Sequence, residues 1–307
     1  MTPERTAILG TRGSRLALVQ AEECAARLRA AGIEVEVRII RTTSEQHPDT
    51  PLAVIDQRDV FTRQLDEALL SGEIDLAVHS LKDVPTELPE WVDLAAVTRR
   101  RDPSDVLVSE GRHTLEDLPQ GGVVATSSQR RRAQLLYHRP DLEVVGIRGN
   151  VDTRVRKMRD GAADAVVLAR AGLERLGLDV PHTVIPPEVM LPAVGQGALT
   201  VTVRKSSPLR ETVRGALNHP PTERAVLAER SMLRTLEGGC RVPVGALAGA
   251  RDEDVRLRGI VASPDGALVY RGDAIGSDPD DVGERLARDL LEQGAEVVLG
   301  EVREVRR

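Results

Sequence analysis

The stretch IDLAVHSLKDVP, Ile74–Pro85, joins an apolar run to a polar segment that a proline ends. Ile74–His79 has the length of one strand and is almost continuously apolar, which is typical of a strand buried on both faces of a parallel sheet. Such strands occur where helices cover both faces of the sheet. The stretch therefore predicts an α/β fold, with Ser80, Lys82 and Asp83 in the loop after the strand.

Strand and helix patterns alternate on both sides of this stretch. The apolar spacing predicts one helix that starts at Ser14 and ends at Gly32, and a second over Thr62–Gly72. Alternating strands and helices predict doubly wound α/β domains, here in two halves that are candidates for similar units. The further predicted strands are Thr6–Thr11, Ile33–Ile40, Gly121–Thr126, Leu142–Ile147 and Asp164–Ala169.

The pattern changes beyond about Pro220. Thr222–Leu236 carries apolar residues at steps of three and four, which predicts a helix with Thr222 as its N-cap and Glu223 in its first turn. A small α+β domain is therefore expected in the last part of the chain. Its other predicted elements are strands at Asp254–Ala262 and Gly266–Ala274 and a helix at Asp281–Ala295.

The stretch LEGGCRVPVG, Leu236–Gly245, places Cys240 directly after two glycines at the end of that helix. Glycine enters the left-handed region without a steric penalty, so Cys240 is expected on a turn between the helix and a following strand. Two explanations of this thiol stay open, because most unpaired cysteines are inert buried hydrophobes and only some are reactive. Cys24 lies within a helical run and is expected in the core.

Length and composition limit the class of protein. A chain of 307 residues is long enough for two or three domains, and its two widely separated cysteines predict no disulfide framework. Six scattered histidines without paired cysteines predict no metal site. The N-terminal residues resemble neither a signal peptide nor a membrane span, so a cytoplasmic protein is expected. The net charge of −6 argues against a nucleic-acid-binding surface.

Arginines and hydroxyl side chains follow several predicted strands. In α/β sheets, ligands bind beyond the carboxyl ends of the strands, where helix N-termini and arginines favour anions. Several such loops predict a ligand with several carboxylates or phosphates, and the lack of Walker A and G-x-G-x-x-G motifs argues against nucleotides. Arg132 is expected on a solvated helix face, since three successive helical residues cannot all face one ligand. The candidates are Arg12, Ser14, Ser80, Lys82, Thr126, Ser127, Ser128, Arg130, Arg131, Arg148 and Arg154.

Five blocks of the sequence together resemble the hydroxymethylbilane synthase family, also called the porphobilinogen deaminase family. The most specific block is ERSMLRTLEGGCRVPVG, Glu229–Gly245, which is similar to the family's cofactor-attachment signature at every defining position. AVHSLKDVP, TSSQRRR, IRGNVDTR and LPAVGQGAL are similar to further family blocks and occur in the expected order. The resemblance extends over essentially the whole chain.

The resemblance implies an activity and a cofactor. In this family a cysteine at the position of Cys240 holds a dipyrromethane through a thioether. Four porphobilinogen molecules are joined onto it with loss of ammonia, and hydrolysis releases the linear tetrapyrrole. The implied catalytic residue is Asp83. The implied cofactor-binding residues are Cys240, Lys82, Ser80, Thr126, Ser127, Ser128, Arg130, Arg131 and Arg154, and the implied substrate-binding residues are Arg12, Ser14, Arg148, Gln196, Arg58 and Phe61.

The chemistry of these residues suits the implied reaction. Loss of ammonia from an aminomethylpyrrole puts positive charge on the pyrrole nitrogen, which an ionised Asp83 would stabilise. Each added pyrrole brings two carboxylates, which explains the many arginines. One stretch departs from the family, because VIDQRDVFTRQ has Asp56 and Asp59 where lid glycines are common and Arg58 in place of a lysine, while Phe61 is kept.

The resemblance also implies a monomer with three domains: residues 1–98 with 197–216, residues 99–196, and residues 217–307. The first two are expected to be α/β domains that resemble periplasmic-binding-protein lobes. A two-lobed carboxylate-binding protein is the main alternative, since it would share the lobes and the arginine loops but would need neither Cys240 nor Asp83. A gene regulator would need a DNA-reading helix pair, for which the acidic composition offers no support.

Overall fold

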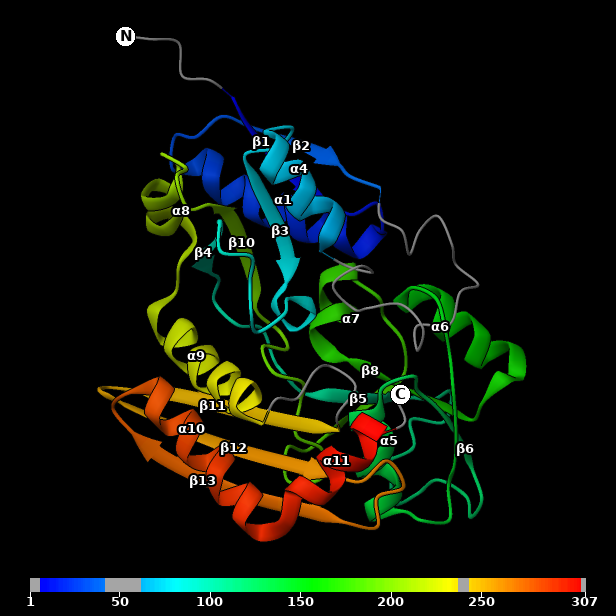
Figure 1. Ribbon diagram of the computed structural model, residues 1–307. Coiled ribbons are helices and arrows are strands. Elements are labelled where there is room, and N and C mark those ends of the chain that lie inside the picture. Colours follow the sequence, from blue (N-terminus) through cyan, green and yellow to red (C-terminus); the bar gives the residue numbers. More distant parts are fainter. Residues whose placement is uncertain (1–5, 42–61, 237–242, 305–307) are drawn as a thin grey trace, which may run out of the picture. The chain divides into compact units, whose positions relative to one another are not determined.

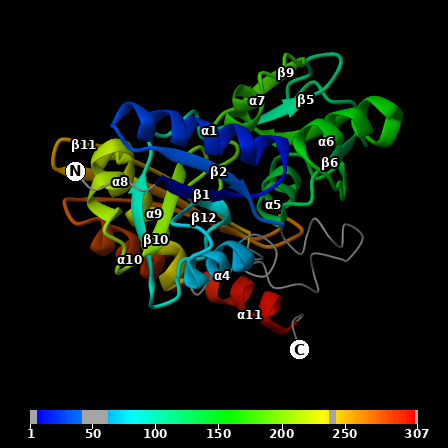
Figure 2. The ribbon, with the colours of Figure 1, turned by 90° about the horizontal axis from the view of Figure 1, so that it is seen from above.

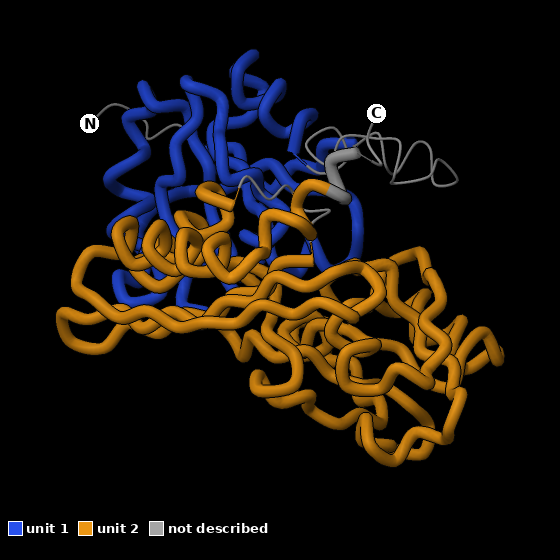
Figure 3. The backbone as a smooth tube through the Cα atoms, turned by 60° about the horizontal axis from the view of Figure 1, so that its bottom comes forward, with its two compact units in different colours: residues 1–100, 198–223 blue, residues 101–197, 224–307 orange. Residues whose placement is uncertain are grey.

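The computed structural model describes residues 6–41, 62–236 and 243–304. The chain divides into two compact units (Figure 3), the first made of residues 1–100 and 198–223 and the second of residues 101–197 and 224–307. The first unit contains one five-stranded sheet, and the second contains a five-stranded and a three-stranded sheet.

The sheet of the first unit has the strand order β2-β1-β3-β10-β4. β1 pairs in parallel with β2 and β3, whereas β10 is antiparallel to both of its neighbours. In the pairing between β3 and β10, Leu199 lies opposite Ser80, so the returning chain borders the end of β3. The strands are β1 (Ala7–Thr11), β2 (Val35–Ile39), β3 (Leu76–Ser80), β4 (Val92–Val97) and β10 (Leu199–Arg204).

Helices cover both faces of this sheet, and Figure 2 shows α1 and α4 on opposite sides of it. Leu76 and Val78 of β3 are buried in one cluster with residues of α1 and α8, and Ala77 between them is buried in another cluster with Leu65 and Leu69 of α4. The expectation of a strand buried on both faces is thus confirmed, and so is the core position of Cys24, which is 1% exposed. The helices are α1 (Arg15–Ala30), α4 (Arg63–Ser71) and α8 (Arg210–Leu217).

The five-stranded sheet of the second unit has the order β7-β6-β8-β5-β9. Its orientations repeat those of the first unit, since β6 is parallel to β7 and β8 while β5 is antiparallel to β8 and β9. The two halves are therefore similar units, as expected. The strands are β5 (Asp105–Val108), β6 (Val123–Ala125), β7 (Glu143–Val145), β8 (Ala165–Ala169) and β9 (His182–Ile185).

Helices cover both faces of this second sheet as well. Leu107 of β5 is buried in a cluster with Leu135 of α5, and the neighbouring Val106 is buried in a cluster with Val155 of α6 and Leu173 of α7. Both α/β sheets are therefore doubly wound, although neither is purely parallel. The helices are α5 (Gln129–His138), α6 (Val151–Lys157), which continues through a π turn at Met158–Ala162, and α7 (Arg170–Leu176).

The three-stranded sheet is an antiparallel meander that belongs to the last part of the chain (Figure 1). A Cβ added at Gly259 of β12 would meet Met232 of α9 and Leu286 of α10, so both helices cover the same face of the sheet. This α+β arrangement agrees with the prediction. Its elements are α9 (Pro220–Thr235), β11 (Val244–Arg251), β12 (Asp254–Ala262), β13 (Val269–Gly276), α10 (Pro279–Leu290), a π turn (Leu291–Ala295) and α11 (Glu296–Glu304).

The three-stranded sheet and the second α/β sheet form one unit because they share many contacts. The backbone N–H of Ala246 in β11 donates to the carbonyl oxygen of Pro192 at 2.9 Å. The Arg271 guanidinium of β13 lies over the Tyr137 ring of α5, 5.5 Å from its centroid. Gly266, in the turn before β13, lies so close to α5 that an added Cβ would come within 2.6 Å of the Ala133 carbonyl oxygen.

Two local predictions are wrong. The helix expected to start after Thr222 starts at Pro220, because proline lacks the N–H that the first turn of a helix leaves unbonded. Gly266 was expected in a strand but lies in a turn at a φ of 74°, a conformation that glycine adopts without a Cβ penalty. The division into three domains stays a prediction.

Candidate active site

The loop after β3 carries the predicted catalytic carboxylate. Leu81–Asp83 forms a single 3₁₀ turn, and Lys82 and Asp83 on it are half-buried. Leu81 anchors the turn, since its side chain is buried and its N–H donates to the carbonyl oxygen of Ala198 at 3.0 Å. Asp83 is thus held on a short, anchored turn at the carboxyl end of β3.

The loop after β1 lies beside this turn, because β1 and β3 are parallel neighbours. Ser14 caps α1 as expected, and its Oγ accepts the N–H of Ala17 at 3.3 Å. Gln20 of α1 then reaches Ser80, to which its Nε2 donates a hydrogen bond at 2.8 Å. These contacts bring Ser14, Ser80 and the Asp83 turn to one edge of the sheet, together with the half-buried Arg12.

His79, the residue before Ser80, is buried, and its Nε2 lies 3.2 Å from Thr202 Oγ1 of β10. Burial and, to a smaller extent, the positive charge of Arg12 lower the pKa of His79 from 6.5 to about 4. The imidazole is therefore neutral at pH 7. It serves as a neutral hydrogen-bonding side chain beneath the loop that carries Asp83.

The loops after β6 and β7 form the corresponding edge of the second unit. Ser127 Oγ donates to the carbonyl oxygen of Ile147 at 2.6 Å and accepts the N–H of the same residue at 3.0 Å, so it joins the two loops. Ser128 is the N-cap of α5, and its Oγ accepts the N–H of Arg131 at 3.4 Å. Thr126 is buried, and its Oγ1 accepts the N–H of Ser128 at 3.2 Å.

Arg130 and Arg131 do not extend into solvent. Each is 6% exposed, and both guanidinium groups face the Asp105 carboxylate at the start of β5. Arg130 Nη1 lies 2.8 Å from Asp105 Oδ2, and Arg131 donates to Asp105 Oδ1 through Nη2 at 2.8 Å and Nε at 3.2 Å. Burial alone would raise the pKa of Asp105, but the two arginines outweigh it and hold this pKa far below its usual value.

Gln196 belongs to the same buried cluster. Its Nε2 donates to Asp105 Oδ1 at 2.9 Å and to the carbonyl oxygen of Pro103 at 2.7 Å. Its contact with substrate stays a prediction. Sequence analysis missed Asp105, and the available signal was an acidic residue at the start of the otherwise apolar run DVLV.

The remaining arginines of these loops occupy different surroundings. Arg154 Nε donates to the carbonyl oxygen of Gly149 at 2.7 Å, so Arg154 closes back on the loop from which its own helix starts. Arg148 is half-buried at the carboxyl end of β7. Arg132, expected on a solvated face, is half-buried as well, because its Nη1 donates to the Val144 carbonyl oxygen at 2.6 Å.

Three predicted site residues lie outside the described residues: Cys240, Arg58 and Phe61. The elements on either side of Cys240 are described, since α9 ends at Thr235 and β11 begins at Val244. Glu229 joins these two elements, because its buried carboxylate accepts the N–H of Ala248 at 2.8 Å and that of Gly195 at 2.7 Å. The signature helix is therefore fixed both to the three-stranded sheet and to the segment that contains Gln196.

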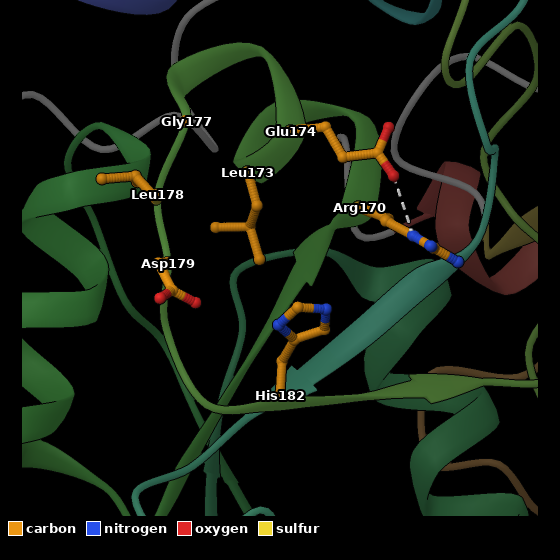
Figure 4. Close-up of a pocket in the computed structure, with 7 residues that line it drawn as sticks. All are labelled: Arg170, Leu173, Glu174, Gly177, Leu178, Asp179 and His182. Carbon is orange, nitrogen blue, oxygen red and sulfur yellow. Dashed lines mark hydrogen bonds and ion pairs between the residues drawn. The ribbon is translucent and has the colours of Figure 1, made fainter.

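A hollow of about 310 Å³ lies elsewhere in the second unit, between α7 and β9 (Figure 4). Two charged groups of its lining bind each other, since the Arg170 guanidinium lies 2.9 Å from Glu174, and Arg170 also binds Asp102 at 2.7 Å. His182 Nδ1 lies 2.8 Å from the Val180 carbonyl oxygen. None of the predicted site residues lines this hollow.

The described ranges, residues 6–41, 62–236 and 243–304, contain neither a metal-ligand cluster nor a membrane-spanning helix. Within them, no group of three or more His, Cys, Asp and Glu side chains is placed to hold a metal ion. None of the helices described there combines the length and apolar character needed to cross a membrane.

Two family models match the chain. Residues 7–211 match "Porphobilinogen deaminase, dipyromethane cofactor binding domain", and residues 224–292 match "Porphobilinogen deaminase, C-terminal domain". The chain belongs to the porphobilinogen deaminase family. It is therefore a member of a family of transferases in haem biosynthesis, and it contains the family's dipyrromethane cofactor-binding domain.

Individual relatives match over nearly the full length of both chains. Porphobilinogen deaminase of Rubrobacter xylanophilus is 68% identical over 299 residues, which are 97% of this chain and 98% of that protein. The porphobilinogen deaminase of Desulforudis audaxviator is 50% identical over 306 residues, with 97% and 98% covered.

Solved structures of ligand-binding proteins are also similar to the chain. A periplasmic substrate-binding protein of an ABC transporter from Coxiella burnetii has a TM-score of 0.44 at 17% identity and covers 71% of this chain and 94% of its own. A nutrient-binding protein from Burkholderia cenocepacia bound to methionine has a TM-score of 0.41 at 16% identity, with 67% and 89% covered.

Proposed function

We propose that this member of the porphobilinogen deaminase family is a hydroxymethylbilane synthase. It condenses four porphobilinogen molecules head to tail onto a dipyrromethane held by Cys240, and it releases the linear tetrapyrrole by hydrolysis. The observation that carries the proposal is that the described loops with carboxylate-binding groups all lie within residues 7–211, the part that matches the family's cofactor-binding domain.

The donor groups of the second unit fit a dipyrromethane. Each pyrrole of this cofactor carries carboxylates, which need positive charge and hydrogen-bond donors. Arg130 and Arg131 face the single carboxylate of Asp105, so these three groups keep a net charge of +1 in a buried cluster. The N-terminal turn of α5, capped by Ser128, adds backbone N–H groups and the positive end of the helix dipole.

Asp83 acts on porphobilinogen as the ammonia leaves. The bond between the aminomethyl carbon and nitrogen breaks, and its electron pair leaves with the ammonia. Positive charge then develops on the pyrrole nitrogen, and the carboxylate of Asp83 stabilises it. The anchored 3₁₀ turn keeps this carboxylate in a fixed position, which lowers the cost of reorganisation during the step.

The carbon–carbon bond forms next. The bound cofactor, when present, supplies a nucleophilic pyrrole carbon at which the chain grows. Joining of the substrate to that carbon would release the proton that the carbon carried, and Asp83 is the group that would accept this proton and pass it on. The final hydrolysis would add water across the bond between the cofactor and the first added pyrrole, with the hydroxyl going to the methylene carbon and the proton to the other carbon, and Asp83 would pass on that proton.

The remaining residues of the site bind carboxylate side chains of cofactor and substrate. Arg12, Ser14 and Arg148 are assigned to substrate, with Gln196, Arg58 and Phe61 as further candidates. Lys82, Ser80, Thr126, Ser127, Ser128, Arg130, Arg131 and Arg154 are assigned to the cofactor. The enzyme is proposed to act in the cytoplasm as a monomer, without a metal and without binding nucleic acid.

The mass of the denatured protein tests this function. A thioether survives denaturation, so protein from cells that supply porphobilinogen should exceed the sequence mass by two linked pyrrole units. Cys240→Ala should lack both this increment and the activity. Cys24→Ala is the matched control, because Cys24 is buried in the core of the first unit and its replacement should leave the increment in place.

An unmodified mass for active parent protein, or an increment that persists in Cys240→Ala, would refute the assignment. A carboxylate-binding protein without catalysis would then be the better interpretation.

A further inference from the structure

Asp105 lies at the centre of a buried charged cluster in the cofactor-binding domain, and its side chain is 0% exposed. Its two oxygens are used by different partners. Oδ1 accepts from Arg131 Nη2, Arg131 Nε and Gln196 Nε2, at 2.8, 3.2 and 2.9 Å, while Oδ2 faces Arg130 Nη1 at 2.8 Å. The two hydrogen bonds from Arg131 fix the orientation of its guanidinium group, and the ion pair with Oδ2 holds the charge of Arg130 beside the carboxylate.

Backbone carbonyl groups complete the positions of the two arginines. Arg131 Nη1 donates to the Val167 carbonyl oxygen in β8 at 2.9 Å, and Arg130 Nη1 donates to the Leu191 carbonyl oxygen at 2.6 Å. These carbonyl groups are neutral, so only Asp105 balances the charge of the pair among the partners named here. Two neighbouring buried guanidinium groups repel each other without it.

The same carboxylate connects the arginines to two of the chain segments that join the second unit to the first. Gln196 Nε2 binds both Asp105 Oδ1 and the Pro103 carbonyl oxygen, and the Arg101 N–H donates to the Gly197 carbonyl oxygen at 3.2 Å. The chain passes between the units at residues 100–101, 197–198 and 223–224. Asp105 therefore links the start of α5 to the first two of these crossings.

We propose that Asp105 is a positioning residue of the cofactor site, which fixes the Arg130 and Arg131 guanidinium groups so that one net positive charge remains near the N-terminal turn of α5 for a carboxylate of the dipyrromethane. This inference rests on the proposed function. Asp105 acts through the arginines and does not itself contact the cofactor, because a carboxylate would repel the ligand's own carboxylates.

Chemical labelling of arginine measures how accessible the guanidinium groups are, and it does not require an active enzyme. Cys240→Ala protein, which is expected to lack the cofactor, should react slowly with phenylglyoxal at Arg130 and Arg131, since each is 6% exposed. Adding Asp105→Asn should release both side chains and raise their labelling about tenfold or more, the order expected when a supporting partner of a positioned group is lost. The exposed Arg156 is the internal reference, and fragmentation of the labelled peptides assigns each site.

Cofactor loading is the second measurement, taken from the mass of the denatured protein with Cys240 in place. Asp105→Asn should lower the loaded fraction about tenfold or more. Val106→Ala is the matched control, because Val106 is the next residue of β5, is 0% exposed and packs in the core on the α6 and α7 side. Val106→Ala should lower the melting temperature and leave the loading unchanged.

The outcomes separate the two proposals. If both arginines are still labelled slowly in the double variant with Cys240→Ala and Asp105→Asn, Asp105 does not position them. Equal loss of loading in Asp105→Asn and Val106→Ala, at equal loss of melting temperature, would overturn it too, since it would show a role in stability alone. Absence of the mass increment from the parent protein would instead refute the proposed function, while the labelling result would still decide the role of Asp105 toward the arginines.

Discussion

His79 Nε2 lies 3.2 Å from Thr202 Oγ1 inside the first sheet, one residue before the loop that carries Lys82 and Asp83. The pKa of His79 is lowered to about 4 by burial and by Arg12, from an ordinary value of 6.5. Neutral His79 therefore contributes stability that is present in full above pH 6.5 and is lost as the pH falls toward 4, because the unfolded chain binds the proton first.

This relationship predicts an acid-dependent loss of stability that one substitution removes. Between pH 6.5 and 5, the His79 contribution to the free energy of unfolding should fall by about 2 kcal/mol. His79→Gln keeps a hydrogen-bonding side chain but does not titrate. Urea unfolding of parent and variant at several pH values should show a stability difference that shrinks over this range, and a constant difference would contradict the prediction.

Asp83→Asn should leave the fold intact and remove most of the turnover. The substitution keeps the shape of the side chain but removes the charge that stabilises the pyrrole nitrogen, so kcat should fall by about 10³-fold. Release of hydroxymethylbilane by the cofactor-loaded variant measures this effect. Asp93→Asn is the control, because Asp93 lies on β4 of the same unit, pairs with Arg210 of α8 and is not one of the site residues. Near-normal turnover by Asp83→Asn would exclude Asp83 as the catalytic carboxylate.

Arg148→Leu should impair the handling of growing chains, because each added pyrrole brings two carboxylates and this substitution removes one guanidinium from the loop after β7. Enzyme that carries one to three extra pyrroles should accumulate, and native electrophoresis should resolve these species as a ladder. Arg156→Leu changes an exposed arginine on α6 and should behave like the parent. If both variants elongate and release product equally well, Arg148 does not bind substrate carboxylates.

The sequence by itself determined the α/β class, the helices on both faces of each α/β sheet and the buried place of Cys24. These features depend on apolar periodicity, which local residues carry. The blocks AVHSLKDVP and TSSQRRR also located the two loops that bear the candidate site. Hydroxyl and charged side chains directly after apolar strands are a local signal, and the direction of the strands then brings them to one edge.

Only the tertiary structure decided how the strands pair and which charges meet. β10 lies antiparallel beside β3 although more than a hundred residues separate them. The sequence of β10, LTVTVR, contains no local pattern that indicates which strand it pairs with. The role of Asp105 likewise depends on its contacts with Arg130 and Arg131. Asp105 lies on β5, whereas both arginines lie on α5. A lone acidic residue in an apolar run and an arginine-rich helix start look unrelated along the chain. Burial makes them one cluster, because charges removed from water must find partners wherever the fold supplies them.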